Sequence, residues 1–268
     1  MTAFLRSLGF MILLVVGGGT VHAAPDLRLA TTTSTENSGL LSAILPLFEA
    51  KYGTRIRVVS VGSGKAMKLG ENGDVDVVLV HSRADEDKFV AAGFGVSRRD
   101  VMYNDFVIVG PESDPAGIRN SDVLTAFKKI SANESRFVSR GDDSGTHKME
   151  QGYWKAAGIK PTAMAGYVSA GLGMGEVLMM AAEMRCYTLT DRATYAAYRA
   201  KTGLAILVSG DPRLFNPYGV IAVNPARHNG LNHVGAMQFI EWLTSPEGQA
   251  AIAAFRIEGE QLFFPNAR

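Results

Sequence analysis

The sequence is poor in cysteine and has no excess of either charge. Cys186 is the single cysteine among 268 residues, so the chain cannot form an internal disulfide and packing must supply its stability. The five histidines, at positions 22, 81, 147, 228 and 233, are scattered, and no Cys or His cluster has the spacing of a metal site. With 27 basic and 26 acidic residues, the chain lacks the basic excess typical of proteins that bind nucleic acid or an anionic membrane. At 47% hydrophobic residues, it is long and apolar enough to bury a sizeable core.

The N-terminus, MTAFLRSLGFMILLVVGGGTVHAA, has the three parts of a secretory signal peptide: Arg6, an apolar run from Leu8 to Val16, and a small-residue end. Cleavage after Ala23 is expected, which makes residues 1–23 a signal peptide and places the mature protein in the periplasm. The apolar run is well short of the roughly 20 residues of a membrane span, although retention as an anchor stays open. Removal of Arg6 leaves 26 basic and 26 acidic residues, so the mature chain is near neutral.

After this segment the chain repeats one pattern: an apolar run, a short Gly/Ser/Thr loop, and a stretch of helical period. The alternation predicts an α/β fold with largely parallel strands. Thr190 is a candidate N-cap for the helix that follows the last of these strands. The expected strands are 27–30, 56–61, 76–80, 136–140, 165–169 and 186–189.

Two further segments, 104–111 and 218–225, resemble each other: both are apolar and end at a proline. In a two-lobed protein they would be the pair of strands that crosses between the lobes. Lobe one is therefore predicted at 26–105 plus 220–268, and lobe two at 106–219. The tail favours a return to lobe one, since Ser245 as N-cap and Pro246 in the first turn predict two amphipathic helices without a new sheet.

Four predicted junctions between a strand and a helix share a composition suited to anions. They read TTTSTENS, GSGK, SRGDDSGTH and SAGLGMG. Each offers small residues, mostly hydroxyl donors, and free backbone N–H groups at the positive end of a helix dipole. A single Ser or Thr in such a place is ordinarily an N-cap. Four junctions, two in each predicted lobe, instead indicate a small anion held where the lobes meet.

The sequence does not match the common enzyme motifs at these loops. A P-loop would need a glycine at Val59 and Ser or Thr at Ala66, and the glycines at 171, 173 and 175 lack the dinucleotide spacing. There is no G-x-S-x-G elbow, and Ser144 and His147 are too close in sequence to form a triad by themselves. The carboxylates show no clear pairing for acid-base chemistry.

Arg140 supplies the positive charge in SRGDDSGTH. Its guanidinium is a planar fork that matches an oxyanion. Asp142 or Asp143 can brace this fork, while Ser144, Gly145 and Thr146 offer hydroxyl and backbone donors at the helix start. The alternative is a surface Arg-Asp pair worth about 0 to 1 kcal/mol.

Much of the chain resembles the tungstate-binding components of bacterial ABC importers and, more distantly, phosphate and molybdate binding proteins of that type. The resemblance covers nearly all of the mature chain; TTTST and SRGDDSGTH are its specific parts, whereas SPEGQ is common to many binding proteins. It implies a type II periplasmic-binding-protein fold, with two α/β lobes, two crossing strands and the ligand in the interlobe cleft. The matching text is LATTTSTENSGLL, VGSGKAMKLGENGDVDVVLVHSRADE, YNDFVIVGP, SRGDDSGTHKME, YTLTDR, GDPRLFNPYGVIAVNP and WLTSPEGQ.

The resemblance also implies a set of ligand residues. They are Thr32, Thr33 and Ser34 in the first donor loop, Ser63 in the second, and Arg140, Ser144 and Thr146 in the loop of lobe two, with Asp142 and Gly145 in support. Ser169 and His147 could equally be a cap and an outer residue. His81 and Ser82 stand where the phosphate relatives place an aspartate that accepts the proton of a protonated oxyanion. An all-donor site suits an unprotonated anion.

These features predict a monomeric protein without enzyme activity, cofactor or nucleic-acid partner that captures tungstate and delivers it to the transmembrane subunit of an ABC permease. Molybdate stays open as the preferred ligand because the two anions have nearly the same size and charge. Binding of phosphate or sulfate, a phosphatase-like hydrolase and a role in sensing also stay open.

Overall fold

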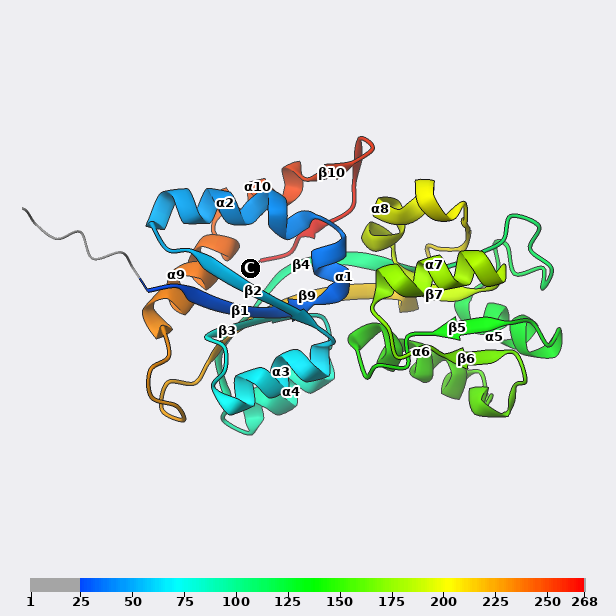
Figure 1. The fold of residues 1–268 in the computed structure, drawn as a ribbon, viewed down its shortest axis with the longest axis horizontal. Coiled ribbons are helices and arrows are strands. Elements are labelled where there is room, and N and C mark those ends of the chain that lie inside the picture. The colour runs from blue at the N-terminus through cyan, green and yellow to red at the C-terminus, as the bar shows by residue number, and fades with distance from the viewer. Residues whose placement is uncertain (1–24, 268) are drawn as a thin grey trace, which may run out of the picture.

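A computed structural model describes residues 25–267 as two α/β lobes placed side by side and connected by two long strands (Figure 1). The signal-peptide prediction for residues 1–23 lies outside the described residues. Within residues 25–267, no helix combines the length and apolar character needed to cross a membrane.

One lobe is built on a mixed sheet in the order β12-β4-β9-β3-β1-β2. β1 is parallel to β2 and β3, whereas β9 is antiparallel to β3 and β4. The strands are β1 (Leu27–Thr32), β2 (Ile56–Val61), β3 (Val77–Val80), β4 (Gly95–Gly110), β9 (Phe215–Val223) and β12 (Phe264–Pro265). The helices are α1 (Thr33–Asn37), α2 (Leu40–Tyr52), α3 (Ser63–Asn72), α4 (Arg83–Ala91), α9 (His233–Thr244) and α10 (Pro246–Ala254).

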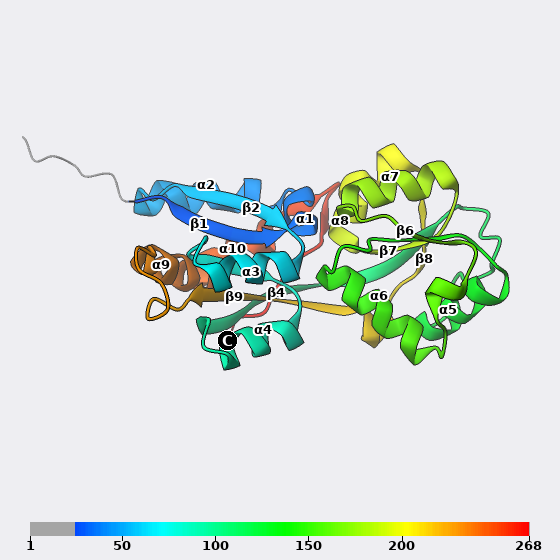
Figure 2. The same ribbon diagram turned by 60° about the horizontal axis from the view of Figure 1, so that its bottom comes forward.

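Both faces of this sheet are covered, because successive strand residues point to opposite sides. Val77 and Leu79 pack with residues of α2, α9 and α10, while Val78 and Val80 pack with residues of α3 and α4. In Figure 1, α2 and α10 lie above the sheet and α3 and α4 lie below it, and Figure 2 shows β4 and β9 running from this lobe toward the other. The continuous apolar run of β3 is therefore explained by burial of the strand on both sides.

The other lobe contains two small strand groups surrounded by helices. β5 is parallel to β6, and β7 and β8 both pair antiparallel with β4. Trp154 is fully buried there, with its ring 4.3 Å from that of Phe127 in an edge-to-face arrangement. The elements are β5 (Phe137–Ser139), β6 (Tyr167–Ser169), β7 (Thr188–Asp191), β8 (Ala205–Val208), α5 (Val123–Ala132), α6 (Gly145–Ala156), α7 (Met174–Met184), α8 (Arg192–Thr202), and the 3-10 turns Pro161–Ala163 and Pro212–Leu214.

β4 and β9 connect the lobes. β4 pairs with β9 from Gly95 to Asp105, and from Phe106 onward it pairs with β7 and β8. β9 begins at Phe215 and runs back into the first sheet beside β3. The change of partners within one continuous strand makes residues 104–106 the point at which the two lobes meet.

Two predicted helix starts have different outcomes. Ser245 caps α10 by accepting a hydrogen bond from the N–H of Gly248, with Pro246 in the first turn, as expected. The prediction for Thr190 is wrong, because this residue lies in β7 and the N-cap of α8 is Asp191. An aspartate caps better than a threonine, since its carboxylate also interacts with the helix dipole.

The tail also differs from expectation. Its two helices are followed by a short hairpin, β10 (Arg256–Ile257) with β11 (Glu260–Gln261), and by β12, which pairs antiparallel with β4. These strands are only two residues long, too short for a periodic signal. The tail therefore completes the edge of the first sheet.

Candidate functional site

Three strand-to-helix junctions meet between the lobes. They are the starts of α1 and α3 in the first lobe and the loop before α6 in the second. The guanidinium of Arg140 donates from Nη2 to Thr33 Oγ1 across the gap at 2.9 Å. A Cβ on Gly62 would lie 3.3 Å from Ser144 Cα, so the loops before α3 and α6 are in close contact. The predicted convergence of donor loops thus brings these three junctions together.

Arg140 is the central charge of this site and is 1% exposed. Its Nη2 also donates to Asp142 Oδ2 at 2.5 Å, while Nε and Nη1 are buried without a hydrogen-bond partner among the described residues. A buried guanidinium with unsatisfied N–H groups at two nitrogens is costly unless another acceptor satisfies them. The free N–H groups at Nε and Nη1 are therefore suited to donate charge-assisted hydrogen bonds to an anion.

Two hydroxyl groups at helix starts share this property. Ser63 Oγ and Thr146 Oγ1 are both buried and have no partner in residues 25–267. Ser63 begins α3 and Thr146 lies in the first turn of α6, so both hydroxyls sit beside backbone N–H groups at a positive helix end. With Arg140, they form a set of donors from both lobes.

Asp142 holds the guanidinium of Arg140 in place, and it is one of the two aspartates predicted for this role. Its Oδ1 accepts from the N–H of Ser144 at 3.2 Å, while Oδ2 holds the guanidinium. Burial acts to raise the pKa of Asp142, but the charge of Arg140 and the bonds from Ser144 outweigh it and lower the pKa. Asp143 is turned to solvent and lies 3.5 Å from Lys148 Nζ. The ionised Asp142 fixes the angle of the fork.

The other predicted donors have local roles. Thr32 and Ser144 are N-caps, accepting from the N–H groups of Thr35 and His147. Ser34 Oγ lies 3.0 Å from Thr32 Oγ1 and 3.3 Å from His81 Nε2. Thr32 and Ser144 thus cap their helices through a lone pair of the hydroxyl oxygen, and donation of their hydroxyl protons to an anion stays a prediction.

Small residues allow the lobes to come together. A Cβ on Gly145 would lie 2.9 Å from the carbonyl oxygen of His81 and 3.1 Å from Ser63 Oγ, both in the opposite lobe. Gly141 has a φ of +61°, and a Cβ there would lie 2.1 Å from Ser169 Oγ. Ser169, the first residue of the fourth junction, therefore packs against the loop that carries Arg140.

Charged groups at the rim also join the lobes. Lys148 of α6 donates to Asp85 Oδ2 of α4 at 2.7 Å. His147 faces its own loop instead, accepting from the N–H of Asp143 at 3.1 Å through Nδ1. Together with the Arg140–Thr33 bond, the Lys148–Asp85 pair shows that the lobes are closed on each other in this structure.

Sequence reasoning did not anticipate the polar groups beneath the site. His81 Nδ1 donates to Asn216 Oδ1, 2.9 Å away, and Asn216 Nδ2 in turn donates to Asn104 Oδ1. Burial lowers the pKa of His81 to about 4, against the opposing effect of the Asn216 bond and with a further decrease from the charge of Arg140. The available signal was an asparagine at the start of the first crossing segment, Asn104, and another two residues before the second, Asn216.

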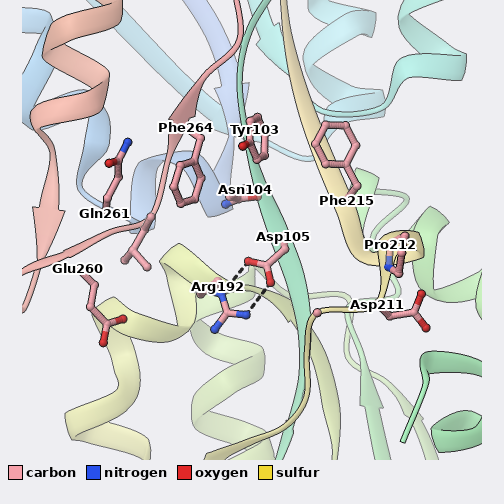
Figure 3. Close-up of a pocket in the computed structure, with 12 residues that line it drawn as sticks. Tyr103, Asn104, Asp105, Arg192, Asp211, Pro212, Phe215, Glu260, Gln261 and Phe264 are labelled. Carbon is pink, nitrogen blue, oxygen red and sulfur yellow. Dashed lines mark hydrogen bonds and ion pairs between the residues drawn. The ribbon is translucent and has the colours of Figure 1, made fainter. Parts of the chain in front are cut away.

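A separate hollow of about 580 Å³ lies beside the crossing strands (Figure 3). Its wall includes the rings of Tyr103, Phe215 and Phe264 and the ion pair of Arg192 with Asp105, whose Nη2–Oδ2 distance is 2.6 Å. Its cation is already paired, and none of its described lining residues has a buried donor without a partner. This hollow therefore lacks the donors of the interlobe site.

Glu150 lies one turn after Thr146 on α6 and is 2% exposed. Its Oε1 accepts from Trp154 Nε1 at 3.0 Å and from Tyr167 OH at 2.9 Å. Burial raises the pKa of Glu150 to about 7, despite these hydrogen bonds. The protonated form is thus favoured by folding.

A pH dependence follows from that pKa. Because it is higher in the folded chain than the ordinary 4.5, Glu150 contributes stability that is complete below about pH 4.5 and is lost as pH rises through about 7. We expect the Glu150→Gln variant to lose less free energy of unfolding than the unmodified chain between pH 5 and pH 8. Urea unfolding of both proteins at the two pH values measures the difference. Identical pH dependence would contradict the assignment.

Two α/β lobes, two antiparallel connecting strands and buried donors facing each other between the lobes define the type II periplasmic-binding-protein fold. A family profile described as a PBP superfamily domain matches residues 19–247. The chain is 51% identical over 251 residues to the tungstate-binding protein TupA of Peptoclostridium acidaminophilum, covering 92% of this chain and 87% of that protein.

Solved structures agree. The tungstate ABC transporter structure from Geobacter sulfurreducens is 53% identical, with a TM-score of 0.79, and the match covers 86% of this chain and 98% of that one. The tungstate binding protein TupA from Desulfovibrio alaskensis G20 is 49% identical, with a TM-score of 0.77, covering 91% and 100%. The chain therefore belongs to the PBP superfamily and, within it, to the family of the TupA proteins.

Proposed function

We propose that the mature chain binds tungstate in the periplasm and delivers it to the transmembrane subunit of an ABC importer, without catalysing a reaction. The observation that carries this proposal is the set of buried donors without partners: Arg140 Nε and Nη1, Ser63 Oγ and Thr146 Oγ1. They come from both lobes, so a ligand that accepts from all of them would hold the lobes together. The names of the TupA relatives support tungstate as that ligand.

The charge of the site fits an anion held mainly by neutral donors. Arg140 is the cation that faces it, and Asp142 offsets part of that charge. Hydroxyl groups and the N–H groups at the starts of α3 and α6 must therefore provide the remaining stabilisation. Such a site suits a tetrahedral oxyanion that carries no proton at neutral pH.

A calorimetric titration of residues 24–268 tests the proposal. We expect tungstate to bind one-to-one and to be displaced only weakly by sulfate or phosphate. Molybdate is the decisive competitor, because its charge and size are nearly those of tungstate. If molybdate, sulfate or phosphate binds more tightly than tungstate, that anion replaces tungstate as the proposed ligand. If none of the four anions binds, the proposal of an oxyanion site is refuted.

A further inference from the structure

Six buried polar side chains form a hydrogen-bonded network through the crossing strands. None is more than 4% exposed, and they come from five separate elements or their ends. Such a network is stable only when each member is satisfied, and it then holds its members in fixed orientations. The members are Asp191 and Thr194, Asn104 on β4, Asn216 on β9, His81 after β3, and Ser34 on α1.

The direction of the hydrogen bonds is set by Asp191. Its Oδ1 accepts from the N–H of Thr194 at 2.9 Å and from Asn104 Nδ2 at 3.4 Å, and it remains an acceptor whether or not Oδ2 carries a proton. Asn104 must therefore turn its oxygen to Asn216, whose Nδ2 donates to it at 2.6 Å. Asn216 Oδ1 is left facing His81 Nδ1 at 2.9 Å.

This order determines the tautomer of His81. An amide oxygen only accepts, so the ring proton of His81 must lie on Nδ1. Burial keeps the pKa of the ring well below neutrality, so Nε2 carries a lone pair and no proton. Ser34 Oγ, 3.3 Å from Nε2, is then the donor of that hydrogen bond. Ser34 has one hydroxyl proton, so its donation to Nε2 requires Thr32 Oγ1, 3.0 Å away, to donate to Ser34 Oγ in turn.

The ring lies at the edge of the donor site. The position of a Cβ on Gly145 is 3.2 Å from His81 Cε1 and 3.1 Å from Ser63 Oγ. His81 Nε2 is bonded to the same Cε1 atom, so a lone pair without a partner there would be a hydrogen-bond acceptor in the wall beside the anion. An oxyanion that carries a proton, such as hydrogen phosphate, needs such an acceptor, whereas a fully deprotonated one does not.

We propose that Ser34 and His81 are specificity-determining positioning residues. The network holds the His81 ring with an unprotonated Nε2, and the Ser34 hydroxyl donates a hydrogen bond to that nitrogen. The site then presents donors only and discriminates against protonated oxyanions. This inference rests on the proposed function, since it concerns the choice among anions at the same site. Under this inference Ser34 is part of the wall of the site and does not donate to the bound anion.

The tautomer can be measured without any mutation in the network. We expect long-range proton–nitrogen NMR of the full mature chain to show His81 with its proton on Nδ1, with His81→Gln used to assign the ring. A proton on Nε2, or a doubly protonated ring at neutral pH, would overturn the inference. This result does not depend on whether tungstate binds.

The effect on specificity is tested with Ser34→Ala. Removal of the hydroxyl frees the Nε2 acceptor, so the preference for tungstate over phosphate should fall by about tenfold. Ser38→Ala is the matched control, because Ser38 is 3% exposed and follows the same helix but bonds only to the main chain at Thr35 and Leu40.

Competition calorimetry at constant pH gives the ratio for each variant. An unchanged ratio in Ser34→Ala, or an equal fall in Ser38→Ala, would contradict the role of Ser34. Failure of the unmodified chain to bind tungstate would instead refute the proposed function and leave the NMR result as the separate test of the network.

Discussion

Replacement of Arg140 by alanine is expected to weaken tungstate binding by about 2 kcal/mol or more, roughly a 30-fold rise in the dissociation constant. The variant loses two buried nitrogen donors without partners, Nε and Nη1, and it leaves the carboxylate of Asp142, 12% exposed, facing the anion. Isothermal titration of the folded variant gives the change. An affinity equal to that of the unmodified chain would remove Arg140 from the site.

Two further variants separate the charge from its geometry. Arg140→Lys retains the positive charge but not the planar fork, so its affinity should lie between those of alanine and arginine. Arg57→Ala removes an arginine that is 67% exposed and pairs with Asp26 on the surface, and it should bind tungstate normally. If Arg57→Ala also weakens binding, the effect of Arg140→Ala reflects net charge and not the site.

The Gly145→Val variant should bind tungstate about 10-fold to 100-fold more weakly while remaining folded. Gly145 begins α6 in the second lobe, and its added Cβ would overlap the His81 carbonyl oxygen of the first lobe at 2.9 Å. The clash exists only when the lobes are closed, so the free energy of unfolding should change by less than about 1 kcal/mol. Titration and urea unfolding measure the two quantities.

Gly152→Val is the matched control for this substitution. It lies on the same helix, and a Cβ there would have no atom within 4 Å. The same loss of backbone freedom and the same β-branched side chain are therefore introduced without an interlobe contact. Small-angle scattering of Gly145→Val measures closure as the compaction that tungstate causes. If this compaction equals that of the unmodified chain, the contact between Gly145 and His81 does not limit closure.

The fold was largely predictable where local patterns are strong. The strands near 27–32, 56–61 and 77–80 are marked by apolar runs before Gly/Ser/Thr loops, and each is observed. The predicted cap Ser245 is observed because hydroxyl, proline and helical period agree within a few residues. Thr190 was misjudged because Thr-Asp offers two adjacent cap residues, and the pairing of β7 with β4 decides where the strand ends.

The site was predictable in part. A charge beside hydroxyl and glycine residues predicted Arg140 and Thr146 as donors, and the family resemblance implied Ser63; all three have buried atoms without partners among the described residues. The same composition gave no means to separate them from Thr32 and Ser144, which serve as caps. A capping hydroxyl and a ligand hydroxyl occupy the same kind of position at a helix start, so only the direction of each side chain distinguishes them.

The sequence by itself determined the alternation of strands and helices, the donor loops at the helix starts and the arginine among them, because these depend on neighbours a few residues away. Tertiary structure alone decided that α1, α3 and α6 begin at one place. It also decided that Asp191, Asn104, Asn216 and His81 form a chain of hydrogen bonds. The physical reason is sheet order: β4, β9 and β3 are adjacent only after the chain has crossed between the lobes and returned. No local pattern records that adjacency.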